Sequence, residues 1–237
     1  MSEDDPFRRN AILRQLPEQE YVRLRPLLQH EAVEAKQTAY EAGVPIRRVC
    51  FPLSAVYSLV GSSDSELTVE VATIGHEGFV GLPVYLGAPT SPQTAFCQIP
   101  GEAATASVDD FRQLLTRDGG MHALLSRFTQ ATMVQVAQNV VCNSSHSAEK
   151  RMARWLLTTQ DRVGRDEFTL THEFLARMLG VHRPTVSETA QRIQAQGLIR
   201  YRRGAITIVD RHRLREIACD CYRIVKAEFD EIRNHRF

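Results

Sequence analysis

The chain has 237 residues, of which 43% are hydrophobic and 24% charged, as expected for a folded globular protein of one large or two modest domains. No apolar run reaches the length of a membrane-spanning helix, and the acidic first residues do not resemble a secretory signal peptide, so we expect a cytoplasmic protein. The net charge of +1 hides an asymmetry: residues 1–145 carry 11 basic and 16 acidic side chains (net −5), whereas residues 146–237 carry 18 and 12 (net +6). A basic C-terminal part favours nucleic-acid binding.

The five cysteines do not predict a disulfide framework, because their number is odd and they are scattered through a chain expected in a reducing compartment. Cys219 and Cys221 are the only pair that is close in sequence. In a helical pattern, a spacing of two residues directs the two thiols to different faces, and the neighbouring sequence supplies no further ligands. We therefore predict neither a metal site nor a bound cofactor.

The first half of the chain combines short helical segments with a series of short strands. Apolar residues at helical spacing predict one or two helices before residue 28. From about residue 32 to residue 106, short apolar or alternating runs are separated by turn clusters such as Gly61-Ser-Ser-Asp64 and Gly87-Ala-Pro89. Regular short strands punctuated in this way predict a β-barrel or a β-sandwich.

A long segment in which Arg127 is the one Asp, Glu, Lys or Arg residue occupies residues 121–145. The 21 residues between Arg127 and Glu149 include no Asp, Glu, Lys or Arg, and their apolar side chains cover well over one face of a helix. Such a helix must be buried on more than one side, either between the barrel and an identical helix of a second chain or at the centre of a monomer. Its glutamines and asparagines argue against a membrane span. The residues that we expect on the dimer helix are Leu125, Phe128, Met133, Val136 and Val140.

Residues 168–209 predict two short helices followed by a two-stranded hairpin. Thr171 is placed to cap the first helix, and Gly180 suits the left-handed residue that ends it. The second helix begins near Arg183, with Pro184 in its first turn, where the missing N–H is harmless. This spacing is that of a helix-turn-helix, and the hairpin with arginines at its tip adds a wing.

The outer face of the second helix carries donors and acceptors suited to a DNA major groove. We expect base contacts from Arg183, Thr185, Ser187 and Glu188. Groups beside this helix and on the wing are placed for the DNA backbone. We expect phosphate contacts from Thr171, His182, Arg192, Arg202 and Arg203. The alternative is an ordinary α+β subdomain with a solvated, charged hairpin.

This module resembles the winged helix-turn-helix of the Crp/Fnr family of bacterial transcription regulators. The resemblance is carried by Leu170-Thr-His-Glu-Phe-Leu-Ala-Arg-Met-Leu-Gly-Val181, Arg183-Pro-Thr-Val-Ser187 and Gly197-Leu-Ile-Arg200. It implies an α+β chain with a cyclic-nucleotide-binding-like β-barrel (jelly roll) in residues 1–120, a dimerisation helix and hinge in residues 121–145, and a DNA-binding domain in residues 146–237. It also implies a homodimer that reads an inverted repeat in double-stranded DNA, with RNA polymerase as a further candidate partner.

The barrel segment is similar to the family's cyclic-nucleotide-binding domain, but it departs from it at the ligand. In cyclic-nucleotide binders, a glutamate holds the ribose hydroxyl, and an arginine next to a serine or threonine holds the cyclic phosphate. This chain has Leu82 after Gly81 and Gln93 before Thr94 at these places. A glutamine cannot neutralise a phosphate, and a buried anion without a partner is strongly disfavoured. We therefore expect a degenerate pocket that does not bind cyclic AMP, with the effector, if there is one, unidentified.

The sequence also bears on two alternative functional classes, an enzyme and a scaffold protein. An enzyme is not expected, because the chain has no glycine-rich phosphate loop, paired-histidine metal motif or nucleophile elbow. The His–Glu pair in Gly75-His-Glu-Gly78 lacks a second histidine at ligand spacing and is interpreted as a turn. The other class is a scaffold protein with a vestigial helix-turn-helix, against which the wing arginines count.

Overall fold

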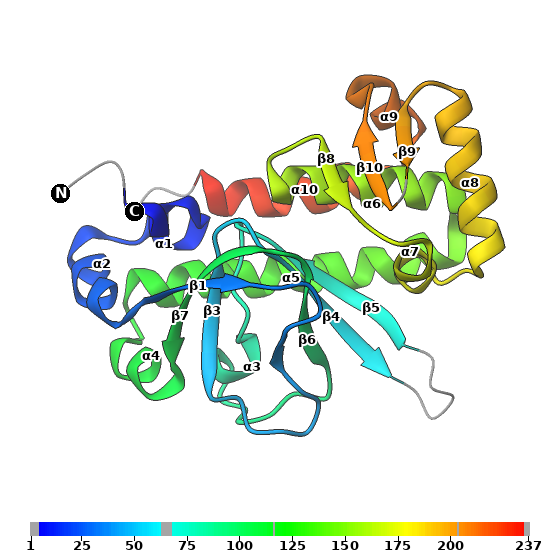
Figure 1. Ribbon diagram of the computed structural model, residues 1–237. Helices are drawn as coiled ribbons and strands as arrows, with labels where there is room; N and C mark the ends of the chain where they lie inside the picture. The colour runs from blue at the N-terminus through cyan, green and yellow to red at the C-terminus, as the bar shows by residue number, and fades with distance from the viewer. Residues whose placement is uncertain (1–4, 63–67, 116, 203, 235–237) are drawn as a thin grey trace.

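The computed structural model describes residues 5–62, 68–115, 117–202 and 204–234. They form an N-terminal β-barrel, a long helix that runs along it and a C-terminal winged module (Figure 1). This architecture confirms the predicted α+β class and the predicted order of the parts. None of the helices in these ranges is long and apolar enough to cross a lipid bilayer.

Two antiparallel sheets make up the barrel. One has the strand order β2-β6-β4-β5 and the other the order β1-β7-β3. The predicted run of short strands is thus confirmed, and the first strand begins slightly before the predicted start. The strands are β1 (Gln29–Val33), β2 (Thr38–Tyr40), β3 (Arg48–Pro52), β4 (Val56–Ser62), β5 (Thr68–Ile74), β6 (Thr94–Ile99) and β7 (Gly101–Ser107).

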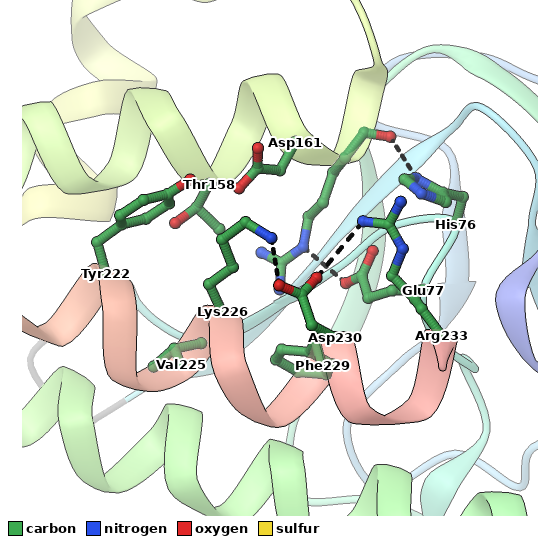
Figure 2. Close-up of a pocket in the computed structure, with 11 residues that line it drawn as sticks. His76, Glu77, Thr158, Asp161, Tyr222, Val225, Lys226, Phe229, Asp230 and Arg233 are labelled. Atoms are coloured by element: carbon green, nitrogen blue, oxygen red, sulfur yellow. Dashed lines mark hydrogen bonds and ion pairs between the residues drawn. The ribbon is translucent and has the colours of Figure 1, made fainter. Parts of the chain in front are cut away.

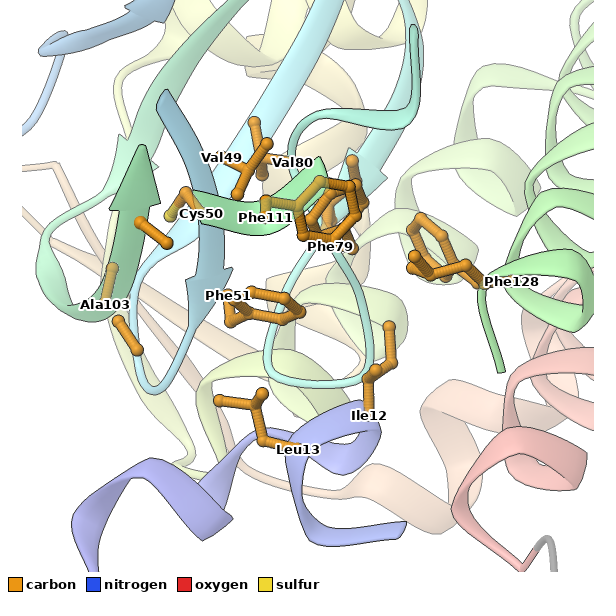
Figure 3. Close-up of a cluster of buried hydrophobic side chains, with 14 of the residues drawn as sticks. Ile12, Leu13, Val49, Cys50, Phe51, Phe79, Val80, Ala103, Phe111 and Phe128 are labelled. Carbon is orange, nitrogen blue, oxygen red and sulfur yellow. The ribbon is translucent and has the colours of Figure 1, made fainter. Parts of the chain in front are cut away.

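Three phenylalanines lie at the centre of the barrel core (Figure 3). The ring centroid of Phe79 lies 5.0 Å from that of Phe51 and 5.2 Å from that of Phe111. Ile12 and Leu13 of the N-terminal helices close the core from one end. Burying each such side chain contributes roughly 1.5–3 kcal/mol. The short helices around the barrel are η1 (Pro6–Arg9), α1 (Ala11–Gln15), α2 (Glu18–Leu24), η2 (Arg25–Leu27), α3 (Leu82–Tyr85) and α4 (Val108–Leu114).

The long helix α5 (Gly120–Ser145) packs its first half into this core. Leu125 and Phe128 are both 0% exposed there. The last helix, α10 (Cys221–Arg233), lies along α5 and places the ring centroid of Phe229 6.1 Å from that of Phe128. Leu125 and Phe128, which we expected on the dimer helix, therefore lie on the face of α5 that the barrel and α10 of the same chain cover, so a partner chain cannot contact them.

The C-terminal module is attached to the barrel through a second apolar core. Val56 of β4 and Ile99 of β6 join the same cluster as Trp155 of the module. The ring centroid of Phe174 lies 6.4 Å from that of Trp155 and 6.2 Å from that of Phe96 in the barrel. The module's elements are α6 (Ala148–Val163), β8 (Glu167–Thr169), α7 (His172–Leu179), α8 (Arg183–Ala195), β9 (Ile199–Arg202), β10 (Ala205–Ile208) and α9 (Arg211–Ile217).

A buried ion pair also joins the barrel to α6. The Arg162 guanidinium donates to the Glu77 carboxylate with an Nε–Oε1 distance of 2.7 Å, and the two side chains are 4% and 6% exposed. Glu77 lies in the turn after β5, where it faces α6 and α10 (Figure 2). In the same turn, His76 Nδ1 lies 3.0 Å from the Arg162 carbonyl oxygen. A Cβ on Gly75 would lie 2.6 Å from the Arg162 Cβ, so the turn needs glycine there.

The charge of Glu77 is maintained by these contacts. Burial alone would raise the pKa of the Glu77 carboxyl, but Arg162, His76 and backbone N–H groups together hold this pKa below its ordinary value. The stabilisation from the pair is therefore present above the ordinary pKa of a glutamate and is lost as the pH falls through the lowered pKa of the folded state. What the sequence indicated as a plain turn is thus an ionic link between the barrel and the C-terminal module.

We expect Arg162→Met to lower the free energy of unfolding by about 3–5 kcal/mol near neutral pH, because Glu77 is left as a buried charge without a partner. The loss shrinks as the pH falls, since Glu77 then becomes protonated. The measurement is urea unfolding at a fixed protein concentration and several pH values. Arg177→Met is the control, because it breaks an exposed pair of similar length (2.8 Å) and costs no more than about 1 kcal/mol. Equal losses in the two variants contradict the role of the buried pair.

Candidate nucleic-acid interface

Local sequence determines how α7, the turn and α8 are built. The Thr171 hydroxyl accepts a hydrogen bond from the Phe174 N–H at 3.2 Å and so caps α7. Gly180 ends α7 with a φ of 60°, in the left-handed region that favours glycine. α8 then begins at Arg183 with Pro184 in its first turn. The predicted cap, turn and second helix are confirmed.

α8 buries one side and exposes the other. Val186 and Ile193 are 0% exposed and pack against the rest of the module. Arg183, Glu188 and Arg192, predicted to contact DNA, are exposed. The outer side of α8 is thus a charged face that is open to a partner.

A shallow depression of about 480 Å³ lies on this outer face, lined by Glu188, Gln191, Arg192 and Ala195. Gln191 and Ala195 were not among the predicted contacts. They lie three and seven residues after Glu188, so helical periodicity alone places them on the same face. The surface offered by α8 therefore extends one turn further than predicted.

Two predicted base-reading residues are less accessible than expected. Thr185 and Ser187 are only partly exposed. The Ser187 hydroxyl donates to the Arg183 carbonyl oxygen at 3.2 Å and lies 3.0 Å from His172 Nδ1. The His172 ring stacks on Tyr201 with centroids 4.6 Å apart. Ser187 therefore holds α7 and α8 together, and its hydroxyl is already engaged within the chain.

The wing is a small antiparallel sheet with the strand order β8-β10-β9. Arg200 and Arg202 are both exposed on β9, and alternate residues of a strand point to the same face. Arg200 was not predicted as a contact, although this period of two could have indicated it. Thr171 and His182 are also exposed near the ends of α7 and α8. Arg203, the remaining predicted phosphate contact, lies outside the described residues.

The predicted effector positions occupy α3 and the segment before β6. Gly81 precedes α3 with a φ of 145°, Leu82 is the first residue of α3, and Gln93 accepts a hydrogen bond from the Ser91 hydroxyl at 3.0 Å. Thr94 Oγ1 accepts from the Ala42 N–H at 3.1 Å. Both polar side chains are therefore engaged by the protein itself.

A cavity of about 120 Å³ lies elsewhere in the barrel. It is lined by Glu31, Val33, Gln37, Thr38, Ala39, Arg48, Val49, Cys50, Tyr57 and Thr105, and none of the four predicted effector residues is among them. Its volume is below the roughly 300 Å³ at which small-molecule sites begin. The predicted effector residues are thus not brought together around this cavity.

Three cysteines and a histidine meet at the end of α5. Cys142 of α5 and His146, which follows the helix, lie beside Cys219 and Cys221. The basis for predicting no metal site is wrong in two respects. Cys219 lies in the loop between α9 and α10 rather than in a helix, so the two thiols of the close pair are not forced apart. The further ligands come from a segment more than 70 residues earlier in the chain.

The C-terminal module matches a known domain. Residues 150–217 match the family model described as the Crp-like helix-turn-helix domain. No curated protein sequence matches the chain. The helices α7 and α8 and the three strands of the wing all lie within the matched residues.

Solved structures share the fold over most of the chain. A protein of Eubacterium rectale described as a transcriptional regulator of the Crp/Fnr family is 17% identical with a TM-score of 0.66, over 87% of this chain and 96% of that chain. FixK2 from Bradyrhizobium japonicum is 15% identical with a TM-score of 0.69, over 81% and 98%. The c-di-GMP responsive global regulator CLP of Xanthomonas campestris is 14% identical with a TM-score of 0.62, over 81% and 99%.

These findings define the fold of the protein and the type of its C-terminal domain. Its fold is that of the Crp/Fnr transcriptional regulators, with an N-terminal sheet domain, a long helix and a C-terminal helix-turn-helix. Within that fold, residues 150–217 are a Crp-like helix-turn-helix domain. The resemblance predicted from the motifs in α7, α8 and β9 is thereby confirmed.

Replacement of Gly180 tests the turn between the two helices. A Cβ at this position meets no atom within 4 Å, so the cost of a side chain comes from the backbone alone. We expect Gly180→Ala to destabilise the module by about 1–2 kcal/mol and Gly180→Asn by less, since asparagine tolerates the left-handed region. Hydrogen exchange of the α7 and α8 amides measures the loss. Equal exchange rates in the Ala variant and the native chain contradict a left-handed turn.

Proposed function

We propose that the protein is a homodimeric, sequence-specific DNA-binding regulator of transcription. The observation that supports this most is the outer face of α8, where Arg183, Glu188 and Arg192 are exposed within a Crp-like helix-turn-helix domain. In this proposal residues 1–120 form a sensing or structural barrel and residues 121–145 the dimer helix and hinge. Residues 146–237 form the DNA-binding domain, although its last helix also packs on α5.

The pattern of exposed cations favours DNA over the alternatives. A major-groove reader needs base-contacting groups on the helix and further cations for the flanking phosphates. α8 supplies the base-contacting groups, and Arg200 and Arg202 on β9 supply the cations for the phosphates. A scaffold with a vestigial module needs neither, and the Crp-like domain favours a regulator over an enzyme.

The second half of α5 supports dimerisation. Met133 and Val140 are 64% and 67% exposed, and Val136 and Val141 are 37% and 47% exposed. Contiguous apolar surface of this kind marks an interaction site on a protein. The exposed face follows the alternating spacing of four and three residues that is typical of a coiled-coil seam. The residues with this spacing are Ser126, Gln130, Met133, Ala137, Val140 and Ser144.

We infer that an identical helix covers this seam. The segment carries no charge between Arg127 and Glu149, so nothing repels a second copy. Two α8 helices related by a twofold axis would then read an inverted repeat whose half-site centres are roughly 34 Å, about one helical turn, apart. The same twofold axis would thus relate the two chains of the dimer and the two half-sites of the DNA.

Val140→Glu should impair dimerisation, because it places two carboxylates in the apolar seam. We expect the variant to sediment as a monomer at micromolar concentration, where the native chain sediments as a dimer. Val22→Glu is the matched control, since Val22 on α2 is also exposed (49%) and lies outside the seam. Dissociation of both variants, or of neither, contradicts the assignment of the seam.

Arg183 and Arg202 should affect DNA binding differently. Arg183 lies in the first turn of α8, and a guanidinium can donate twice to a guanine edge. Arg183→Ala should therefore cost about 1–3 kcal/mol on the cognate site and relax preference at one base pair per half-site. Arg202→Ala should weaken all sequences alike and reduce the salt slope by about one. Binding to matched and scrambled duplexes at several salt concentrations separates the two. An equal effect of Arg183→Ala on both duplexes contradicts base reading.

Cyclic AMP should not be the effector. Leu82 and Gln93 stand where cyclic-nucleotide binders place a carboxylate and a guanidinium, and Gln93 is engaged by Ser91. We expect titration calorimetry to detect no binding of cyclic AMP at tens of micromolar ligand, a range of weak affinity. A submicromolar dissociation constant contradicts the assignment of the degenerate pocket.

A further inference from the structure

Three of the five cysteines form a buried cluster of their own. Cys142, Cys219 and Cys221 are 0%, 5% and 2% exposed, and they group apart from both apolar cores. His146 follows the last turn of α5, and its backbone N–H donates to the Cys142 carbonyl oxygen at 3.1 Å. Segments that are far apart in the sequence thus bring three thiols and an imidazole to one point.

The four candidate ligand atoms lie close enough together to bind one metal ion. Cys142 Sγ lies 3.5 Å from Cys219 Sγ, and Cys221 Sγ lies 3.7 Å from His146 Nδ1. All four atoms lie within 4.8 Å of one another. A tetrahedral zinc ion with its usual bond lengths separates two sulfurs by about 3.8 Å and a sulfur from a nitrogen by about 3.6 Å. The Cys142–Cys219 and Cys221–His146 distances differ from these values by a few tenths of an ångström.

We propose that Cys142, His146, Cys219 and Cys221 bind a single metal ion in a tetrahedral site, with Zn²⁺ as the cation that the ligands fit best. Three thiolates and one imidazole are the ligand set of closed, structural zinc sites. A cluster of several irons distributes its cysteines over different metal atoms and needs them further apart. A disulfide uses two thiols at about 2.05 Å and gives no reason for the third thiol and the histidine.

The surroundings favour such an ion electrostatically. Cys221 is the first residue of α10, so it lies at the positive end of the helix dipole. Three thiolates and one Zn²⁺ leave a net charge of −1. The positive charge of Arg154 on α6 acts on all three sulfurs and offsets this excess.

The site would tie together parts of the chain that are distant in sequence. Cys142 and His146 belong to the end of α5 and the hinge before α6, whereas Cys219 and Cys221 precede α10. A bound ion therefore fixes the start of α10 to the hinge between the long helix and the winged module. Because a metal that binds only the folded state stabilises it, removal of the ion should loosen this junction first.

Metal analysis of the full-length protein, purified under reducing conditions, tests the site. We expect about one zinc per chain in the native protein and in Cys97→Ser, the control, whose thiol is buried in the barrel. Zinc should be lost or bound at least tenfold more weakly in Cys219→Ser. Zinc that is absent from the native protein, or bound equally by the Cys219→Ser variant, overturns the proposal.

Cobalt substitution identifies the ligands and does not depend on DNA binding. Co²⁺ in the native site should give the visible bands of a tetrahedral ion and a sulfur-to-cobalt charge-transfer band of an intensity that corresponds to three thiolates. Cys221→Ser should reduce that intensity by about a third, and His146→Cys should keep the site and raise it by about a third. His146→Cys also guards against a mere failure to fold, because it must bind. Octahedral spectra, or a Cys142–Cys219 disulfide in place of metal, contradict the site.

Discussion

The buried ion pair between Arg162 and Glu77 is the constraint on which the arrangement of the two halves depends. Neither group can leave the other without leaving a buried charge without its partner, which costs several kcal/mol. Because Glu77 belongs to the barrel and Arg162 to α6, the barrel and the winged module are held as one unit. The apolar contacts of Phe174 with Phe96 and Trp155 strengthen the same interface.

With the module held in this way, α5 serves two purposes along its length. Its first half is a core helix of the barrel, covered on its other side by α10. Its second half leaves the barrel core and exposes the apolar seam around Met133 and Val140. The helix therefore links the barrel, the proposed partner chain and the hinge of the DNA-binding module. A metal ion at its C-terminal end would act on that hinge directly.

The sequence was most informative where structure is local. The Thr171 cap, the left-handed Gly180 and Pro184 depend on neighbours within a few residues, and all were predictable. What could not be predicted depends on contacts across the chain. Glu77 looked like a turn residue because its partner lies 85 residues away. The cysteine cluster was missed for the same reason. The sequence of a helix that is apolar on several sides also does not reveal which apolar face α10 will cover.

Selection of duplexes from a random-sequence pool by the full-length protein tests the central claim most directly. The claim is that two α8 helices, related by the symmetry of the α5 seam, read DNA together. We expect the enriched sequences to form an inverted repeat with half-site centres about one helical turn apart. Enrichment of a single unrepeated motif would contradict the dimeric arrangement, and a pool without any enriched motif would contradict sequence-specific recognition itself.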